Sequence, residues 1–271
     1  MSSSVALARA VRAHVLRMVH RANASHVGSC LSVADVVAVL YARVLRVDPA
    51  RPDDPARDRF VLSKGHAAAA VYATLAERGF FPRDWLDTYG RDGSALAGHL
   101  TRTGVPGVDV STGSLGHGLA LGIGFALAAR ADGRETRSHV VLSDGECDEG
   151  STWEAALFAP HHRLDNLVAC VDANGIQSLG SVREVLDLEP LADKWRAFGW
   201  HVVELDGHDH EALARGFEEA KAVKGRPTAI VARTVKGKGV SFMEGQLAWH
   251  YRSPDEEQLR RALAEVEGGR G

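Results

Sequence analysis

Cysteine is scarce in this sequence. The 271 residues include three cysteines, Cys30, Cys147 and Cys170, which lie far apart and never in a Cys-x-x-Cys spacing. An odd number of scattered thiols excludes a disulfide framework and gives no support to a structural zinc site. Free thiols are typical of a reducing compartment, so we expect a cytoplasmic protein.

An excess of positive charge and a long hydrophobic run are also missing. The chain has 32 Lys and Arg against 35 Asp and Glu, a net charge of −3, which leaves no basic footprint for nucleic acid and no polybasic membrane address. Apolar runs such as 119–130 are about a dozen residues long, short of the roughly 20 that cross a bilayer. We therefore expect small molecules or another protein as partners, with no nucleic acid and no membrane.

Acidic residues are missing from the start of the chain. No Asp or Glu precedes Asp35, although several arginines do, which is the pattern of an organellar transit peptide. The same segment also carries an apolar stripe at helical spacing. The stripe consists of Val5, Ala8, Val11, Val15 and Val19. We favour an ordinary first helix over a transit peptide.

Helical periodicity and short β-branched runs alternate along the chain. Helices are expected over 5–22, 33–45, 66–78, 117–130, 152–162, 190–198, 210–222 and 255–266, and strands over 60–62, 139–142, 167–171, 201–205 and 228–231. Strands joined by helices imply right-handed crossovers. We predict an α/β protein with an open, mostly parallel sheet and helices on both faces. It forms one domain over 1–271, with a tail over 267–271 that resembles the start of a linker.

Glycine is concentrated in the stretch 112–124, TGSLGHGLALGIG. Glycines before a helix let backbone amides approach a phosphate. The spacing also resembles a relaxed dinucleotide fingerprint, but 108–110 is a poor strand, which disfavours an oxidoreductase. The helix that follows is apolar on every side, which predicts burial on every side. Gly122 and Gly124 inside it predict that another helix, in this chain or in another subunit, packs against their bare backbone.

Polar residues follow two of the expected strands at their carboxyl ends. Asp144 and Gly145 come after the strand 139–142, and Asn174 follows the strand 167–171. Parallel neighbours end at the same edge of a sheet, so Asp144 and Asn174 can face one ion. One carboxylate, one amide and one backbone carbonyl suit a magnesium ion whose other ligands come from a diphosphate. The EF-hand calcium pattern fails here.

These motifs resemble those of the transketolase family. Ser-Asp-Gly-Glu at 143–146, followed by Asn174, is similar to the thiamine diphosphate motif, with Ser143 where that motif usually has Gly. Five further motifs resemble transketolase in order across essentially the whole chain, at 23–28 (NASHVG), 62–67 (LSKGHA), 98–99 (GH), 106–118 (PGVDVSTGSLGHG) and 236–250 (KGKGVSFME, then WH). The resemblance covers the N-terminal, diphosphate-binding domain, as found in two-chain transketolases, and implies the thiamine diphosphate-binding fold.

The resemblance also implies thiamine diphosphate and Mg²⁺ as cofactors. The magnesium ligands would be Asp144, Asn174 and the Ile176 carbonyl. The residues that contact thiamine diphosphate would be His66, Gly113, Ser114, Leu115, Gly145, Asn174 and His250. The catalytic residues would be His26, His99 and His250. Of these, His26 and His99 would face the sugar hydroxyls, with which neutral imidazoles exchange protons and hydrogen bonds near pH 7.

Other polar residues of the motifs receive different interpretations. Glu149 resembles a carboxylate that links paired active sites in the family, and Cys147 is interpreted as a space-filler rather than a nucleophile. The segment 206–210, with Asp and His, is interpreted as a turn and helix cap rather than a metal cluster. Several histidines stay unassigned, namely His14, His20, His161, His162, His208 and His210.

The second domain of the family, with the glutamate that activates the aminopyrimidine ring, is missing from this chain. The resemblance therefore implies a split transketolase-like enzyme that is active only with a C-terminal transketolase subunit on a separate chain. The simplest closed assembly is an α2β2 heterotetramer. The enzyme would transfer a two-carbon ketol unit from a ketose or ketose phosphate donor to an aldehyde acceptor.

Two alternatives remain open from the residues. One is a subunit of another thiamine diphosphate enzyme, such as a deoxyxylulose-phosphate synthase-like enzyme or a 2-oxo acid dehydrogenase component, and the other is a non-catalytic binding domain. The histidines at 26, 66, 99 and 250 favour polyol substrates over pyruvate. Val27, Ser29-Cys30 and Tyr251-Arg252 depart from the family pattern, and bulk and charge near the mouth of the site predict an altered substrate.

Overall fold

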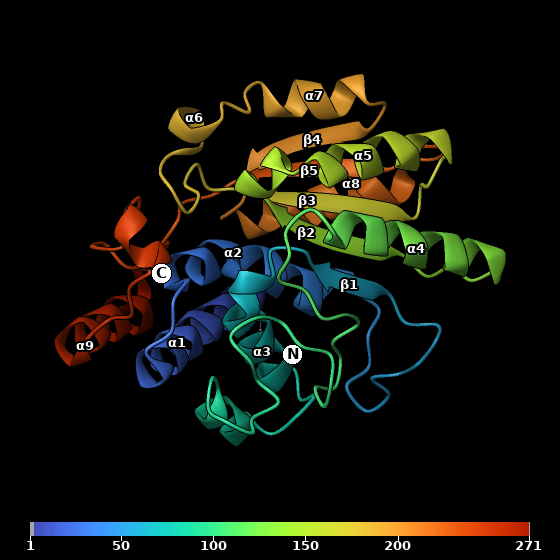
Figure 1. Ribbon diagram of the computed structural model, residues 1–271. Coiled ribbons are helices and arrows are strands. Elements are labelled where there is room, and N and C mark those ends of the chain that lie inside the picture. The colour runs from blue at the N-terminus through green and yellow to red at the C-terminus, as the bar shows by residue number, and fades with distance from the viewer. Residues whose placement is uncertain (1–2, 271) are drawn as a thin grey trace.

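The computed structural model describes residues 3–270, which form an α/β fold around one sheet (Figure 1). The sheet has five strands in the order β1-β2-β3-β5-β4, and every neighbouring pair is parallel. The strands are β1 (Arg59–Leu62), β2 (Ser138–Ser143), β3 (Leu167–Ala173), β4 (His201–Asp206) and β5 (Thr228–Arg233). Each lies where the sequence predicts a strand, so the predicted parallel α/β fold is confirmed.

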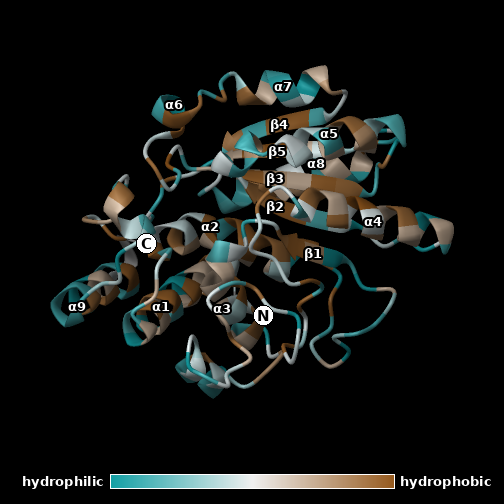
Figure 2. Ribbon diagram, viewed as in Figure 1, coloured by the Kyte–Doolittle hydropathy of each residue, from teal (hydrophilic) through white to brown (hydrophobic). Residues whose placement is uncertain are grey.

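Helices cover both faces of this sheet, as predicted. The core on one face contains α1 (Ser4–Ala22), α2 (Val27–Val39), α3 (Ala68–Glu77), α8 (His210–Ala222) and α9 (Glu256–Glu265), of which α9 packs onto α1. The core on the other face contains α4 (Gly118–Ala131), α5 (Gly150–His161) and α7 (Leu191–Ala197). Alternate residues of the central strands enter the two cores, for example Cys170 on the first face and Val171 on the second, because side chains alternate along a strand. Figure 2 shows these strands as mainly hydrophobic. The shared sheet supports the interpretation of 1–271 as one domain, which stays a prediction.

Helix α2 begins six residues earlier than predicted, at Val27 rather than residue 33, and continues through a π-helical turn, Leu40–Val44. All of its residues are buried, so the sequence has no amphipathic periodicity to mark its start. The whole segment 27–44 is, among residues 3–270, the one helix long and apolar enough to cross a membrane, and 89% of it is buried inside the fold. The longest apolar helix is therefore longer than its sequence pattern predicts, and it forms the centre of a core.

Helix α4 corrects the expectation of burial on every side. Leu119 and Ile123 are buried against the sheet, whereas Leu121 is 40% exposed. A Cβ atom at Gly122 would lie 2.2 Å from Val140 Cγ2, so its bare backbone packs against strand β2 rather than against another helix. A Cβ atom at Gly124 would meet nothing within 4 Å, because this side of α4 is open in the chain.

The two ends of the described chain pack onto the fold. Helix α1 buries Val11, Val15 and Val19 completely, which agrees with the interpretation as a first helix. At the other end, Val266–Arg270 forms a π-helical turn after α9, and Glu267 pairs with Arg17 at 2.5 Å. The predicted linker is therefore helical over its described part. Four short elements were not predicted, namely α6 (Val182–Val185) and the 3-10 helices Arg83–Thr88, Gly145–Asp148 and Leu247–His250.

Candidate functional site

A cavity of about 220 Å³ opens at the carboxyl edge of the sheet. Its walls come from segments that follow β1, β2, β3 and β5 and from the N-terminus of α2. Ligands of open α/β folds bind at this edge. The lining residues are His26, Ser29, His66, His99, Gly113, Leu115, Ser143, Asp144, Gly145, Asn174, Ile176, Gln177, Ser178, Lys236 and His250. Every residue predicted for the site is among them except Ser114, which is exposed.

Strand pairing brings Asp144 and Asn174 together. Ser143, the last residue of β2, is paired with Asp172 near the end of β3. The next residues therefore leave the sheet side by side, and the backbone N–H of Gly175 donates to Asp144 Oδ2 at 2.6 Å. The convergence expected from neighbouring parallel strands is thus present.

Asp144 is a buried carboxylate that is held by backbone N–H groups. Its side chain accepts hydrogen bonds from the backbone N–H groups of Gly145, at 2.8 Å, and Gly175. Within residues 3–270, no cationic side chain forms an ion pair with it. Burial raises the pKa of Asp144 to about 6, since a carboxylate loses hydration there. A bound cation would relieve this cost, so the environment fits the predicted role as a metal ligand.

The other two predicted metal ligands already have hydrogen-bond partners. Asn174 Oδ1 accepts from the Ile176 N–H at 3.1 Å, and the Ile176 carbonyl accepts from Lys236 Nζ at 2.9 Å. A carbonyl oxygen has a second lone pair, so neither contact excludes coordination. Among the described residues, no group of three or more His, Cys, Asp or Glu side chains could hold a metal. The predicted magnesium set needs only one such side chain, Asp144.

A buried glutamate holds the glycine-rich loop against the end of β2. Glu146 Oε1 accepts from the Ser63 hydroxyl and from the Gly116 N–H at 2.9 Å. The Ser63 hydroxyl in turn accepts from the Gly118 N–H at 3.0 Å. A Cβ atom at Gly118 would lie 2.2 Å from Ser63 Oγ, so this position requires glycine. The start of α4 is therefore fixed beside the cavity.

Four histidines predicted from separate motifs meet in the cavity. The ring of His26 lies 5.2 Å from that of His66, 5.7 Å from that of His99 and 5.0 Å from that of His250, measured between centroids. His26 has a left-handed backbone, φ +73°, at the N-terminus of α2, and its N–H donates to the His250 carbonyl at 2.7 Å. This turn aims the ring into the cavity.

Three of these histidines, His26, His66 and His250, are in surroundings that favour the neutral imidazole. Burial, followed by the charges of neighbours, lowers the pKa of His26 to about 4 and that of His250 to about 3, and it lowers the pKa of His66 well below its usual value. The nearby cations Lys236 and Lys64 act in the same direction. Neutral rings can both donate and accept hydrogen bonds. His99 is exposed at the mouth.

Two buried lysines lie near the cavity, and one of them, Lys236, lines it and gives it positive charge. Lys64 pairs with Asp172 at 2.5 Å, and both side chains are fully buried. Lys236 Nζ contacts His250 Nδ1 at 2.9 Å as well as the Ile176 carbonyl. Burial, and then the charge of Lys64, lower the pKa of Lys236 to about 8. An anionic group in the cavity would offset this cost, so the site fits a diphosphate.

These lysines and Glu146 were not predicted as site residues. Lys64 and Lys236 lie inside the motifs at 62–67 and 236–250, and a lysine flanked by glycine beside a predicted phosphate site was a usable signal. Nothing local marks Glu146, because an acidic residue in a turn is usually solvated. It is 0% exposed only because Ser63 and the glycine loop close over it.

Residues given other interpretations lie around the cavity. Glu149 is exposed, and a Cβ atom at Gly116 would lie 2.7 Å from its Cβ. Burial raises the pKa of the Cys147 thiol well above its usual value, which disfavours a thiolate nucleophile. His208 and His210 both contact the carboxylate of Asp35, at 2.7 and 3.0 Å.

Comparison with known proteins gives full-length matches. The family profile described as transketolase, thiamine diphosphate binding domain, matches residues 3–265. A 6-deoxy-6-sulfo-D-fructose transketolase subunit of Clostridium sp. is 45% identical over 96% of this chain and 94% of its own length. An apulose-4-phosphate transketolase subunit of Phocaeicola vulgatus is 44% identical over 94% of this chain and 90% of its own length.

Solved transketolases share this fold. The enzyme from Leishmania mexicana superposes with a TM-score of 0.91 at 34% identity, over 98% of this chain and 42% of that one. The enzyme from Campylobacter jejuni gives a TM-score of 0.89 at 31% identity, over 98% and 42%. The chain thus spans about two fifths of the length of these solved transketolases. The profile, the relatives and the fold agree, and the chain belongs to the transketolase family as a thiamine diphosphate-binding domain.

Proposed function

We propose that this chain is the cofactor-binding subunit of a two-chain transketolase. The enzyme transfers a two-carbon ketol unit from a ketose or ketose phosphate donor to an aldehyde acceptor, using thiamine diphosphate and Mg²⁺. The observation that carries the proposal is the cluster of four histidines beside the buried Asp144, whose pKa is raised, at one cavity. The names of the two full-length relatives, both transketolase subunits, support it.

The metal and cofactor are assigned to specific atoms of this chain. Asp144, Asn174 and the Ile176 carbonyl would hold Mg²⁺, and this one-carboxylate set leaves the remaining positions to diphosphate oxygens and water. Gly113, Leu115, Gly145 and His66 line the cavity and would contact thiamine diphosphate. Ser114 is retained as a contact of the assembled enzyme, since its exposed position leaves it free to meet the cofactor or the partner.

The chain's own part in the chemistry is binding, orientation and proton movement. When bound, thiamine diphosphate supplies a thiazolium carbon that can become a carbanion. His26, His99 and His250 offer imidazole nitrogens to the hydroxyls of the sugar. Because the low pKa values of His26 and His250 keep these rings neutral at pH 7, they can accept a hydroxyl proton as well as donate a hydrogen bond. Pyruvate, without hydroxyls, would make little use of this cluster, which disfavours the other thiamine enzymes.

The partner is a second chain that carries the C-terminal transketolase domain, most simply in an α2β2 heterotetramer. The exposed apolar residues of α4 and α5 support this assembly. Leu121 is 40% exposed, Leu157 is 62% exposed and Phe158 is 42% exposed, on two helices that pack against each other. We take these exposed apolar side chains on neighbouring helices as the contact surface for the second chain.

The class of sugar that the enzyme uses is proposed from the names of two relatives and from one side chain of this chain. The two relatives act, by name, on a sulfonated fructose and on apulose-4-phosphate, so an anionic sugar is the proposed class. Tyr251 is 57% exposed, and its ring lies 4.8 Å from that of His250. The bulk of the Tyr251 side chain beside the histidines supports a donor or acceptor sugar that differs from the one usual in the family. Three buried, free cysteines support a reducing, cytoplasmic location.

Cofactor titration of the assembled complex tests this function. Calorimetry with thiamine diphosphate should show tight binding with Mg²⁺ and at least about tenfold weaker binding when the ion is chelated, because the diphosphate charge is then unneutralised. Equal affinity with and without a divalent ion would refute the metal assignment. The absence of any cofactor binding would favour the alternative of a non-catalytic domain.

A further inference from the structure

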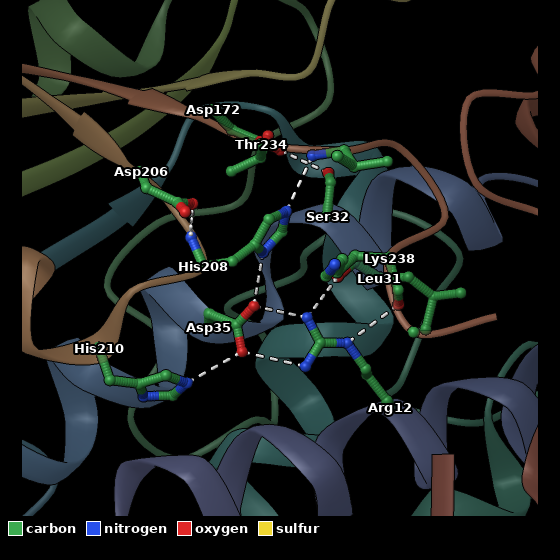
Figure 3. Close-up of polar contacts among 12 residues, drawn as sticks. Arg12, Leu31, Ser32, Asp35, Asp172, Asp206, His208, His210, Thr234 and Lys238 are labelled. Atoms are coloured by element: carbon green, nitrogen blue, oxygen red, sulfur yellow. Dashed lines mark hydrogen bonds and ion pairs between the residues drawn. The ribbon is translucent and has the colours of Figure 1, made fainter. Parts of the chain in front are cut away.

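A buried polar network lies behind the cavity and joins segments that are far apart in the sequence (Figure 3). Arg12 of α1 forms two hydrogen bonds to Asp35 of α2, from Nη1 to Oδ1 at 3.0 Å and from Nη2 to Oδ2 at 2.6 Å. The same carboxylate contacts His208 Nδ1 at 2.7 Å and His210 Nε2 at 3.0 Å. Burial favours protonation, but the histidine contacts and the Arg12 charge hold the pKa of Asp35 well below its usual range.

His208 extends this network to the segment that carries Lys236. Its Nε2 accepts the backbone N–H of Val235 at 2.8 Å. The ring is therefore in the tautomer that donates its Nδ1 proton to Asp35. His210 differs, because its Nε2 contacts the same carboxylate while its Nδ1 has no hydrogen-bond partner within residues 3–270.

The segment 234–238 is held on both sides of Lys236. The N–H of Val235 is bound by His208, and the carbonyl of Lys238 accepts from Arg12 Nε at 3.1 Å. Between them, Gly237 has φ +83° and donates its N–H to the Gly28 carbonyl at 3.0 Å. The side chain of Lys236 is 1% exposed and reaches the Ile176 carbonyl. Its ammonium position therefore depends on a backbone that His208 and Arg12 hold together with the Gly245 N–H, which donates to the Lys236 carbonyl at 2.9 Å.

We propose that His208 is a positioning residue that fixes the 234–238 segment and so presents Lys236 to the diphosphate of the cofactor. His208 lies outside the cavity lining and acts through the Val235 N–H. The inference rests on the proposed function, because that function supplies the diphosphate. It also distinguishes His208 from His210, since both bind Asp35 and only His208 reaches the segment.

Three variants of the full chain separate positioning from stability. His208→Phe removes the acceptor for the Val235 N–H, and His208→Gln restores it because Oε1 of glutamine reaches about as far as Nε2. His210→Phe is the matched control, as it removes one hydrogen bond to the same carboxylate. Each is examined by thermal melting, by amide hydrogen exchange of peptides covering 234–238, and by calorimetry with inorganic pyrophosphate and Mg²⁺.

Both phenylalanine variants should melt at lower temperature than the wild type. In His208→Phe alone, amide exchange over 234–238 should accelerate and pyrophosphate affinity should fall about tenfold, the equivalent of about 1.4 kcal/mol. His208→Gln should bind within about threefold of the wild type. These results would support the proposal.

Other outcomes would contradict the proposal, and they separate the positioning role of His208 from the proposed function. Unchanged pyrophosphate affinity and segment exchange in a folded His208→Phe protein, or equal losses in His210→Phe, would show that His208 is merely structural while the proposed function stands. If His208→Phe does not fold, His208→Ala takes its place, because it removes the same acceptor of the Val235 N–H without adding bulk, and unchanged affinity and segment exchange in that protein decide against the proposal. A wild-type chain whose full complex binds neither pyrophosphate nor thiamine diphosphate would refute the proposed function and the positioning role together.

Discussion

Asp144 is the residue on which the account of the cofactor depends. It follows β2, it is 4% exposed, and burial raises its pKa to about 6. A carboxylate in this state destabilises the fold when it ionises, unless a cation is near. Because its ionised form destabilises the fold, a carboxylate at this edge of a parallel sheet is a strong candidate for a functional residue.

Replacing Asp144 should remove the dependence of cofactor binding on a divalent ion. In Asp144→Ala, the affinity for thiamine diphosphate in the presence of Mg²⁺ should fall on the order of 100-fold, because the one charged metal ligand is lost. Asp148→Ala is the control, since Asp148 accepts from Gln177 Nε2 at 3.0 Å and lies outside the cavity lining. Titration calorimetry on the assembled complex measures both. An unchanged magnesium-dependent affinity in Asp144→Ala would refute the assignment.

His99 and His66 should differ in what their loss affects. His99→Ala should lower kcat/KM by roughly 10² to 10⁴, the range for a positioned proton donor or acceptor, with little change in Tm because the side chain is exposed. His66→Ala should weaken cofactor binding first. Steady-state kinetics with a ketose donor, cofactor titrations and thermal melts compare the two. Lost stability with full turnover per folded molecule would show His99 to be structural.

The buried histidines predict an acid dependence of stability. His26 and His250 have folded pKa values of about 4 and about 3, whereas an unfolded histidine titrates near about 6.5. Between about pH 4 and pH 6.5 the unfolded chain therefore binds more protons than the folded chain. The stability that the fold has above about pH 6.5 is lost as the pH falls towards 4. Urea midpoints of the wild type should fall over this interval.

Removing these two rings should flatten that dependence. The double variant His26→Gln with His250→Gln should lose less stability between pH 6.5 and 4 than the wild type does. His161→Gln, at an exposed position on α5, should keep the wild-type slope. An identical slope in the double variant would mean that the two imidazoles are protonated in the folded chain.

At the scale of elements, periodicity predicted most of the fold. Helices with one apolar face, such as α1 and α8, and the β-branched strands all lie where they were expected. The start of α2 was missed because Val27 and its neighbours are buried on every side, so no polar residue marks a solvent face. The turn Val182–Val185 was missed because it is only four residues long.

The site was predictable where it follows from strand ends and motifs. Asp144 and Asn174 meet because β2 and β3 are parallel neighbours. The place of Lys236 was not predictable, because it depends on the turn at Gly237 and on contacts from Arg12 and His208. Long-range contacts of this kind leave no local pattern in the sequence.

The exposed face of α4 and α5 makes a prediction about assembly. Leu157→Arg should weaken association of the complex on the order of 100-fold, because the charge would be buried in an apolar contact. Val5→Arg, at a position 47% exposed on α1, should leave association unchanged. Sedimentation over a range of protein concentrations measures both. Equal assembly of the Leu157→Arg protein would exclude this face from the interface.

At the scale of the whole molecule, the proposed function makes this chain one half of an active site. The cavity gathers histidines from near both ends of the chain, His26 and His250, at one edge of the sheet. The chain supplies the proposed metal ligands and the imidazoles, and solved transketolases of this fold are more than twice as long. The central claim is that catalysis needs the second subunit.

Ketol transfer measured with and without the partner tests this claim most directly. The purified chain, with thiamine diphosphate and Mg²⁺, should show no turnover of a ketose donor and aldehyde acceptor. Addition of a chain carrying the second transketolase domain should restore turnover, to a plateau at equal amounts of the two chains, because each site is completed by one copy of each. Full ketol-transfer activity from the isolated chain would contradict the account.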